Sequence, residues 1–213
     1  PCSPEDLPGA MDAWQTYIHA DAPDLLVQLA VLHAEFAAIH PFLDGDGRLG
    51  RVITPMFLKS KGLLSTPNFY LSDYLERHRD EYYDRLLAVS RDGDWTGWCA
   101  FFLRAITEQA ATNQRKAQAI HALDNARKDW MVEATRSQYG GRALDWLFIR
   151  PIFAAPDFVA HAGIPEPTAK RILRVLKDPA AGLLREIRPA SGRRPAVLAF
   201  PELLNICEGR EAF

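Results

Sequence analysis

The sequence predicts a mainly α-helical protein whose C-terminal part carries a short β-hairpin. Three observations lead to this fold class. Apolar residues recur at helical spacings of three and four through much of the first 136 residues. No alternating strand pattern occurs before the glycine pair Gly140-Gly141. Beyond that pair, three short helical segments are followed by two β-like runs.

Size and composition indicate a globular protein. The 213 residues are enough for one large domain or two modest ones. With 48% hydrophobic and 24% charged residues, neither a disordered nor a fibrous chain is indicated. No membrane span or secretory leader is recognisable. Cys2, Cys99 and Cys207 are far apart, which argues against a disulfide framework or a zinc site, so we expect a cytoplasmic protein.

The first clear unit is a helix, a glycine-rich loop and a second helix. Residues 25–39 place their leucines, with His33, on one helical face. Pro41 and the glycines after it interrupt this helix, and helical spacing resumes from Arg48 to about Lys61. The loop therefore joins the end of one helix to the start of the next.

Two further helical stretches follow. Ser72 or Asp73 can cap a helix that ends near Gly93. Another apolar stripe begins after Asp94, and its polar continuation to about Arg136 predicts either one long helix or a second one. The first 136 residues are therefore expected to be entirely helical or loop.

The C-terminal part has the outline of a small winged helix-turn-helix domain. Three short helices are predicted before two β-like runs, and the loop between the runs carries Arg193 and Arg194. The predicted helices cover 143–149, 156–161 and 167–176, and the β-like runs cover 183–187 and 196–200. We accordingly expect domains at 1–110 and 141–213, joined by a helical linker at 111–140.

Charge is distributed unevenly between these regions. The whole chain has a formal net charge of −2. Residues 1–140 hold 14 Lys and Arg against 19 Asp and Glu, whereas residues 141–213 hold 11 against 8. The mild basic excess of the C-terminal part is compatible with nucleic-acid contact, although a solvated surface is the commoner reason for such an imbalance.

The loop between the first two predicted helices gathers several chemically useful groups. Its glycines, Gly45 and Gly47, allow backbone N–H groups to form an anion-binding nest at a helix start. Arg48 and Arg51 are three residues apart and can bind one phosphate chain with forked hydrogen bonds. The segment reads His40-Pro41-Phe42-Leu43-Asp44-Gly45-Asp46-Gly47-Arg48-Leu49-Gly50-Arg51.

The same loop supplies an acid and a base. Asp44 can hold magnesium, which favours a carboxylate together with phosphate oxygens. His40 stands at the loop entrance, where it can take a proton from an incoming hydroxyl group. A polar turn with solvated side chains is the plainer reading of an Asp-Gly-Asp-Gly sequence, but it does not account for the full spacing.

This segment resembles the signature of the Fic family, His-x-Phe-x-Asp/Glu-Gly-Asn-Gly-Arg-x-x-Arg, at every fixed position except Asp46, where the family has asparagine. The resemblance implies a helical Fic domain that transfers AMP from ATP, with Mg²⁺, to a Tyr, Thr or Ser hydroxyl of a protein. It implies His40 as general base, Asp44 as metal ligand and Phe42 as a buried anchor. The phosphate-binding residues would be Gly45, Asp46, Gly47, Arg48 and Arg51.

The exchange at position 46 introduces a negative charge near the phosphates. In the family the asparagine helps to hold them. An aspartate would weaken ATP binding, alter nucleotide choice or recruit another cation, and the sequence leaves these alternatives open.

Segments downstream of the loop resemble the later helices of Fic domains. By that resemblance, Tyr83 and Leu86 would border the adenine, and the alternative is that both are core residues. Ser3 to Pro8 resembles the segment after the family's target-aligning flap, and the flap itself is not in this sequence. The inhibitory pattern Ser/Thr-x-x-x-Glu fits only Ser72 to Glu76, in the wrong helix. An inhibitor is therefore expected upstream or from a separate partner.

Residues 164–176 resemble the recognition helix of winged helix domains that are fused behind Fic domains. If this helix enters a DNA major groove, its contacts would come from four side chains, with the hairpin arginines near phosphates. Protein docking or dimerisation is an equally open alternative. The candidate DNA contacts are Thr168, Lys170, Arg171, Arg174, Arg193 and Arg194.

These observations predict a protein adenylyltransferase that uses ATP and a hydroxyl-bearing protein, with DNA or a docking protein as a partner of the C-terminal domain. The oligomeric state is open, with a homo-oligomer among the expectations, and no membrane partner is expected. One alternative function is a DNA-binding transcriptional regulator with a catalytically weak Fic domain. Another is a Fic enzyme that transfers UMP, phosphate or phosphocholine, or that removes AMP.

Overall fold

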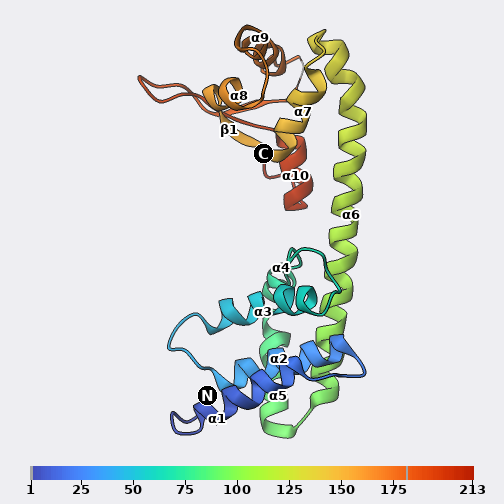
Figure 1. The fold of residues 1–213 in the computed structure, drawn as a ribbon, viewed down its shortest axis with the longest axis vertical. Coiled ribbons are helices and arrows are strands. Elements are labelled where there is room, and N and C mark those ends of the chain that lie inside the picture. Colours follow the sequence, from blue (N-terminus) through green and yellow to red (C-terminus); the bar gives the residue numbers. More distant parts are fainter. Residues whose placement is uncertain (1, 181) are drawn as a thin grey trace. The chain divides into compact units, whose positions relative to one another are not determined.

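The structure, a computed structural model, describes residues 2–180 and 182–213. The chain divides into two compact units, Pro1–Thr112 and Asn113–Phe213. The division falls within helix α6 (Trp95–Thr135), some way before the glycine pair at 140–141 (Figure 1). Much of the expected linker belongs to α6, and its Leu123 and Met131 pack into the core of the second unit.

The first unit is helical, as predicted, in the part of it that the structure describes. Helix α2 is central: it packs against α1, α3 and α5, and several of its side chains have no exposed surface (Figure 1). The helices are α1 (Leu7–His19), α2 (Leu25–Ile39), α3 (Asp46–Ser60), α4 (Ser72–Arg77), α5 (Arg79–Asp92) and the first turns of α6.

Local side chains explain most of the helix boundaries. The carboxylate of Asp24 accepts hydrogen bonds from the first amides of α2, so the predicted bounds 25–39 are confirmed. Gly93 ends α5 in the left-handed conformation, as expected near that position. The single helix predicted from Ser72 is in fact two, because the backbone at His78 (φ −114°, ψ 35°) leaves the helical region. Helix α3 begins at Asp46, earlier than predicted.

Tryptophan and glycine fix the packing of α2 on its neighbours. The buried indole of Trp98 donates to the carbonyl of Ala30 at 2.8 Å, and Trp14 donates to that of Leu32 at 2.9 Å. At Gly50 an added Cβ would lie 3.5 Å from the Phe36 ring, so glycine lets α3 approach α2 closely. The two helices that flank the glycine loop are therefore held together directly beside it.

Helix α6 is continuous over 41 residues, which decides between the one long helix and the two that the sequence allowed. Its length alone exceeds that of a membrane span, but its second half is polar and mixed in charge. Within residues 2–180 and 182–213, no helix combines the length and the apolar character that crossing a membrane requires.

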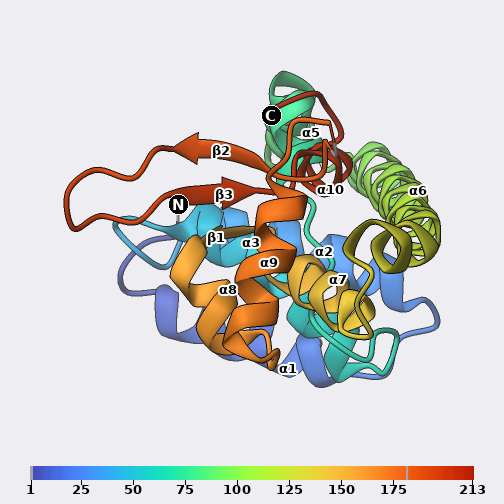
Figure 2. The same ribbon diagram turned by 90° about the horizontal axis from the view of Figure 1, so that it is seen from above.

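The second unit contains the predicted helices and hairpin together with one additional strand and one additional helix. Strand β3 lies between β1 and β2, and both pairings are antiparallel, with Leu198 opposite Phe153 on one side and Glu186 on the other (Figure 2). The elements are α7 (Gly140–Ile149), β1 (Ile152–Ala154), α8 (Ala155–His161), α9 (Glu166–Leu176), β2 (Arg185–Arg188), β3 (Val197–Ala199) and α10 (Pro201–Glu208).

Three elements were not predicted, and each carries a weak sequence signal. Helix α1 has Pro8 and Gly9 in its first turn and no fully buried residue. Strand β1 has three residues, of which only Phe153 is buried, and α10 is a helix of 8 residues that starts with a proline. The predicted fold class is nevertheless confirmed: the protein is mainly helical, with one small antiparallel sheet.

Candidate functional site

The glycine loop connects the end of α2 to the start of α3. His40 closes α2 in the left-handed conformation, with its amide bonded to the carbonyl of Phe36 at 3.1 Å. Gly45 has φ 97°, a value that glycine adopts without steric cost, and its carbonyl accepts the amides of Arg48 and Leu49 at 2.9 Å each. This turn leaves the first amides of α3 directed out of the helix end, where an anion can accept their hydrogen bonds.

Both motif arginines lie over the glycine backbone. A Cβ added at Gly45 would be 3.6 Å from a terminal nitrogen of Arg48, and one at Gly47 would be 3.6 Å from a terminal nitrogen of Arg51. Two guanidinium groups therefore flank the helix start that carries the unsatisfied amides. The structure brings together the predicted phosphate-binding groups, with the exception of the side chain of Asp46.

Asp46 is buried and faces His40. Its side chain is 4% exposed, one carboxylate oxygen accepts the amide of Phe42 at 3.2 Å, and the other lies 3.3 Å from Nε2 of His40. The contact between this second oxygen and His40 is close enough for an ion pair, but its geometry is not that of a hydrogen bond. The second oxygen has no hydrogen-bond partner among the described residues. In this conformation the carboxylate contacts the loop and the imidazole.

Asp44, the predicted metal ligand, is on the outer side of the loop. It forms an ion pair with Arg48 at 3.2 Å, and the two side chains are 91% and 73% exposed. Exposed pairs of this kind contribute little stability, so either partner can exchange the other for a ligand. Among the described residues no group of three or more His, Cys, Asp or Glu side chains could hold a metal ion by itself. The surroundings of Asp44 therefore fit a magnesium ion held jointly by one carboxylate and by phosphate oxygens.

Two cavities lie near the loop, and Tyr83 is part of the lining of both. The first, of about 320 Å³, is bordered by His40, Tyr83 and Leu86 together with alanines of α2. The second, of about 590 Å³, is bordered by Arg51, Tyr82 and Tyr83. The side chains predicted as base and as adenine contacts therefore share one cavity, and Tyr83 connects it to the phosphate side.

A buried histidine contacts a partly buried tyrosine that lines the second cavity. Nε2 of His33 is 3.1 Å from the hydroxyl of Tyr82, whereas Nδ1 has no partner among the described residues. Burial, aided by the charge of Arg51, lowers the pKa of His33 to about 4. Burial also raises the pKa of Tyr82 to about 12, against the opposing effect of Arg51. Both groups are therefore neutral near pH 7 and lie within the field of Arg51.

The sequence places His33 on an apolar helix face but does not predict its contact with Tyr82. The available signal was a titratable ring inside an otherwise apolar stripe, which predicts burial but not its partner. Tyr82 was assigned only to a helix.

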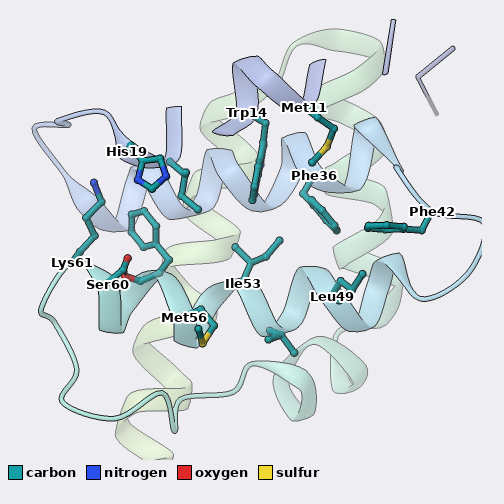
Figure 3. Close-up of a pocket in the computed structure, with 13 residues that line it drawn as sticks. Met11, Trp14, His19, Phe36, Phe42, Leu49, Ile53, Met56, Ser60 and Lys61 are labelled. Carbon is teal, nitrogen blue, oxygen red and sulfur yellow. The ribbon is translucent and has the colours of Figure 1, made fainter. Parts of the chain in front are cut away.

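The expectation that Phe42 is a buried anchor is wrong. Its side chain is 49% exposed and borders an apolar groove of about 560 Å³ between α1, α2 and α3 (Figure 3). Trp14, Phe36 and Leu49 line the same groove. The ring therefore lies on the apolar side of the loop, away from the polar groups of the motif.

The predicted DNA-contact residues lie on α9 and on the loop between β2 and β3. Lys170 pairs with Glu166 at 2.5 Å, and Arg171 donates to the carbonyl of Thr135 at 2.7 Å, which engages its guanidinium within the unit. Arg174 borders an open hollow of about 540 Å³. The remaining candidates are Thr168, which is partly buried, and Arg193 and Arg194, which are exposed.

In the first unit, a glycine turn, an open helix start, two guanidinium groups and an imidazole meet beside two cavities. These features are those expected of a helical domain that binds phosphate next to a general base.

Comparison with known proteins finds similarity to one family. The model of the Fic/DOC family matches residues 1–58, which include α1, α2, the whole glycine loop and most of α3. A curated protein named protein adenylyltransferase Fic, from Nematostella vectensis, is 28% identical over 137 residues. Residues 1–58 of this chain are therefore similar to the Fic/DOC family.

The matched proteins are longer than this chain. The alignment with the Nematostella vectensis protein covers 63% of this chain and 30% of the relative. The crystal structure of a Fic family protein from Desulfovibrio desulfuricans G20 covers 92% of this chain and 55% of its own, with 19% identity and a TM-score of 0.48. None of these matches identifies the second unit as a winged helix domain, which stays a prediction.

Proposed function

We propose that the N-terminal unit is a protein adenylyltransferase, which moves AMP from ATP to the hydroxyl group of a Tyr, Thr or Ser side chain. The observation that carries this proposal is the convergence of His40, Arg48 and Arg51 on one helix start beside two cavities. The name of the 28% identical relative supports AMP as the transferred group.

In the proposed reaction the acceptor hydroxyl attacks the α-phosphorus of ATP. A new P–O bond forms, the bond from the α-phosphorus to the bridging oxygen breaks, and pyrophosphate leaves. His40 takes the hydroxyl proton as general base. Arg48, Arg51 and the amides at Asp46 and Gly47 bind the phosphate oxygens and stabilise the charge that moves onto them.

Magnesium would be held by Asp44 and by phosphate oxygens, at the expense of the exposed pair with Arg48. When bound, the ion neutralises phosphate charge and assists departure of pyrophosphate. The only ligand that the chain itself would supply in this arrangement is the exposed carboxylate of Asp44, beside the anion site.

The adenine would occupy the cavity bordered by Tyr83 and Leu86. Its volume of about 320 Å³ lies at the lower end of the range for small-molecule sites. Its lining is mostly alanine, leucine, valine and aromatic side chains, which suits a flat base, and Glu35 and Ser90 add polar groups. The phosphates would then extend past Tyr83 toward Arg51. A cytoplasmic location is part of the proposal, because ATP is abundant there and Cys2, Cys99 and Cys207 are far apart along the chain.

The test is transfer of label from ATP by the whole chain, with a soluble extract as the source of acceptor proteins. Label in the α-phosphate is expected to become attached to protein, and label in the γ-phosphate is not. Intact-mass analysis distinguishes AMP from UMP, phosphate and phosphocholine, which add different masses. Protein label from the γ-phosphate, or loss of AMP from a premodified protein, would contradict adenylyl transfer in favour of the related reactions.

We propose duplex DNA binding as a second function, located in the C-terminal unit. The supporting observation is that exposed cations lie on helix α9, at Lys170 and Arg174, and on the loop of the neighbouring hairpin, at Arg193 and Arg194. A helix followed by a basic hairpin is the arrangement with which winged helix domains contact DNA. Salt-dependent retardation of a duplex by the whole chain is expected, whereas a lack of retardation at low salt would favour a protein-docking role.

A further inference from the structure

Asp46 is a buried carboxylate with two contacts, and both are inside the glycine loop. One oxygen accepts the amide of Phe42 at 3.2 Å, and the other faces Nε2 of His40 at 3.3 Å. A carboxylate that is only 4% exposed needs partners, because burying an unpaired charge is costly. The imidazole is the one side chain that an ion pair connects to this carboxylate in the described part of the chain.

The backbone at His40 favours this contact. Its φ of 53° and ψ of 60° are left-handed, a conformation that costs a residue other than glycine about 1–3 kcal/mol and persists where the surroundings enforce it. The turn directs the imidazole toward the first residue of α3, where Asp46 begins the helix. The ring is still 49% exposed, so it can contact a substrate while it contacts the carboxylate.

We propose that Asp46 is a positioning residue for His40. Its negative charge faces Nε2 at 3.3 Å without an aligned hydrogen bond, and it favours the neutral tautomer in which Nε2 carries the proton. Nδ1 is then the nitrogen with a free lone pair. The carboxylate therefore favours one ring orientation and one tautomer through its charge, a role that the acidic member of a catalytic triad fills through a hydrogen bond.

The asparagine of the Fic signature would have the opposite effect. Its single oxygen would accept the amide of Phe42, and its NH₂ group would then face Nε2 as a donor. The imidazole would respond by accepting at Nε2 and carrying its proton on Nδ1. One exchange of oxygen for nitrogen at position 46 therefore reverses the preferred tautomer of His40.

For the reaction, this inference rests on the proposed adenylyl transfer. The acceptor hydroxyl would give its proton to Nδ1 of His40, and the imidazolium that forms would be stabilised by the facing carboxylate. The same negative charge stands near the phosphate site and opposes ATP binding. Asp46 thus assists the chemical step and weakens nucleotide affinity.

The direct test is the tautomer of His40, read from ¹⁵N NMR of the whole chain without ligand. The His40 signals are assigned by their loss in His40→Ala. The native chain is expected to carry its proton on Nε2, and the Asp46→Asn variant on Nδ1. The same tautomer in both proteins would overturn the proposal, and this readout holds even if no adenylyl transfer is found.

Two further variants complete the NMR experiment. Asp46→Ser removes the carboxylate but keeps a residue suited to a helix start, and its His40 is expected to return to the weaker intrinsic preference of a free imidazole for Nε2–H, so the Nδ1–H population should grow. Asp92→Asn makes the same charge change in the exposed pair with Arg91 and is expected to leave the His40 signals unchanged. An Nδ1–H population in Asp46→Ser that is no larger than in the native chain would overturn the proposal independently of the asparagine variant.

Kinetics provide a second readout. In Asp46→Asn we expect kcat to fall at least about tenfold as imidazolium stabilisation is lost. The KM for ATP is expected to fall about tenfold, because a repelling charge is removed. A merely structural defect would lower kcat without tightening ATP. An unchanged or higher kcat in this variant would contradict the positioning role.

Discussion

The positive charges of the two units are organised differently. In the first unit, Arg48 and Arg51 lie over glycine backbone at a helix start, beside His40 and two cavities. In the second unit, Arg174 and the hairpin arginines Arg193 and Arg194 are exposed along a helix and a loop. Side chains of different chemistry that meet at one place can carry out a reaction. Positively charged side chains that are spread over a surface can only attract anions. The first unit can therefore be tested as an active site and the second only as a surface.

The largest expected effect comes from removing the base at the converging site. In His40→Ala, transfer of AMP should fall by about 10²–10⁴-fold, the usual contribution of general base catalysis. The measurement is α-phosphate label on protein per unit time. His121→Ala removes an exposed histidine of the second unit and should transfer AMP at the native rate. If both variants lost AMP transfer equally, the reaction could not be assigned to the first unit.

The buried ring under the site should make the stability of the first unit depend on pH. The pKa of His33 is lowered to about 4 in the folded chain, so between about pH 6.5 and 4 the unfolded chain binds the extra proton. The contribution of neutral His33 is therefore complete above pH 6.5 and is lost as the pH falls toward 4. From pH 7 to 4.5 the loss should be on the order of 2–3 kcal/mol.

The check on this prediction is denaturant unfolding of the native chain and of His33→Phe at both pH values, followed by tryptophan fluorescence. Three of the five tryptophans, Trp14, Trp95 and Trp98, lie in this unit, and His33 stacks on Trp98 with ring centroids 5.9 Å apart, so a large part of the signal reports on this unit. The phenylalanine variant fills the ring volume without titrating and should lose less stability on acidification. The same acid loss in both proteins would show that His33 does not hold a lowered pKa.

The two loop glycines provide a matched pair. Gly45→Ala places a Cβ on a residue with φ 97° and should lower the free energy of unfolding by about 1–2 kcal/mol. Gly47 has no positive φ, and its Cβ would meet only the end of the Arg51 side chain at 3.6 Å. Gly47→Ala should therefore leave stability unchanged or raise it by up to about 1 kcal/mol. Thermal denaturation followed by circular dichroism measures both, and a reversed order would contradict the loop geometry.

The smallest expected effect is in the second unit. Double replacement of Arg193 and Arg194 by alanine should weaken duplex binding similarly for all sequences and reduce its salt slope by about two. Fluorescence anisotropy over a range of salt concentrations measures this. Replacing Arg150 and Arg210, which lie outside the hairpin loop, makes the same charge change as a control. A loss confined to one DNA sequence would indicate base contacts and a more specific site than the structure suggests.

Much of the site could be predicted from the sequence because its groups are close together along the chain. The spacing of His40, Arg48 and Arg51 fixes their relative positions once the flanking helices are known, and α2 was predicted with its observed bounds. The hairpin and three helices of the second unit were predictable for the same reason. They are short and local, and turn residues separate them.

What the sequence did not reveal depends on tertiary contacts. Strand β1 has three residues and is recognisable only by its pairing with β3. Phe42 was expected to be buried, but the groove beside it leaves the ring half exposed. Asp46 was expected near phosphates, and its contact with His40 follows from the left-handed turn at the end of α2. Such turns are hard to foresee at a residue other than glycine.

The central claim is that the start of α3 is the phosphate site of a nucleotide, and calorimetric titration of the whole chain with ATP and Mg²⁺ tests it most directly. We expect one binding site whose affinity falls by about tenfold or more in Arg51→Ala, because a guanidinium held over Gly47 binds phosphate. Equal affinity in the native chain and in Arg51→Ala, or no heat of binding in the native chain, would contradict the account.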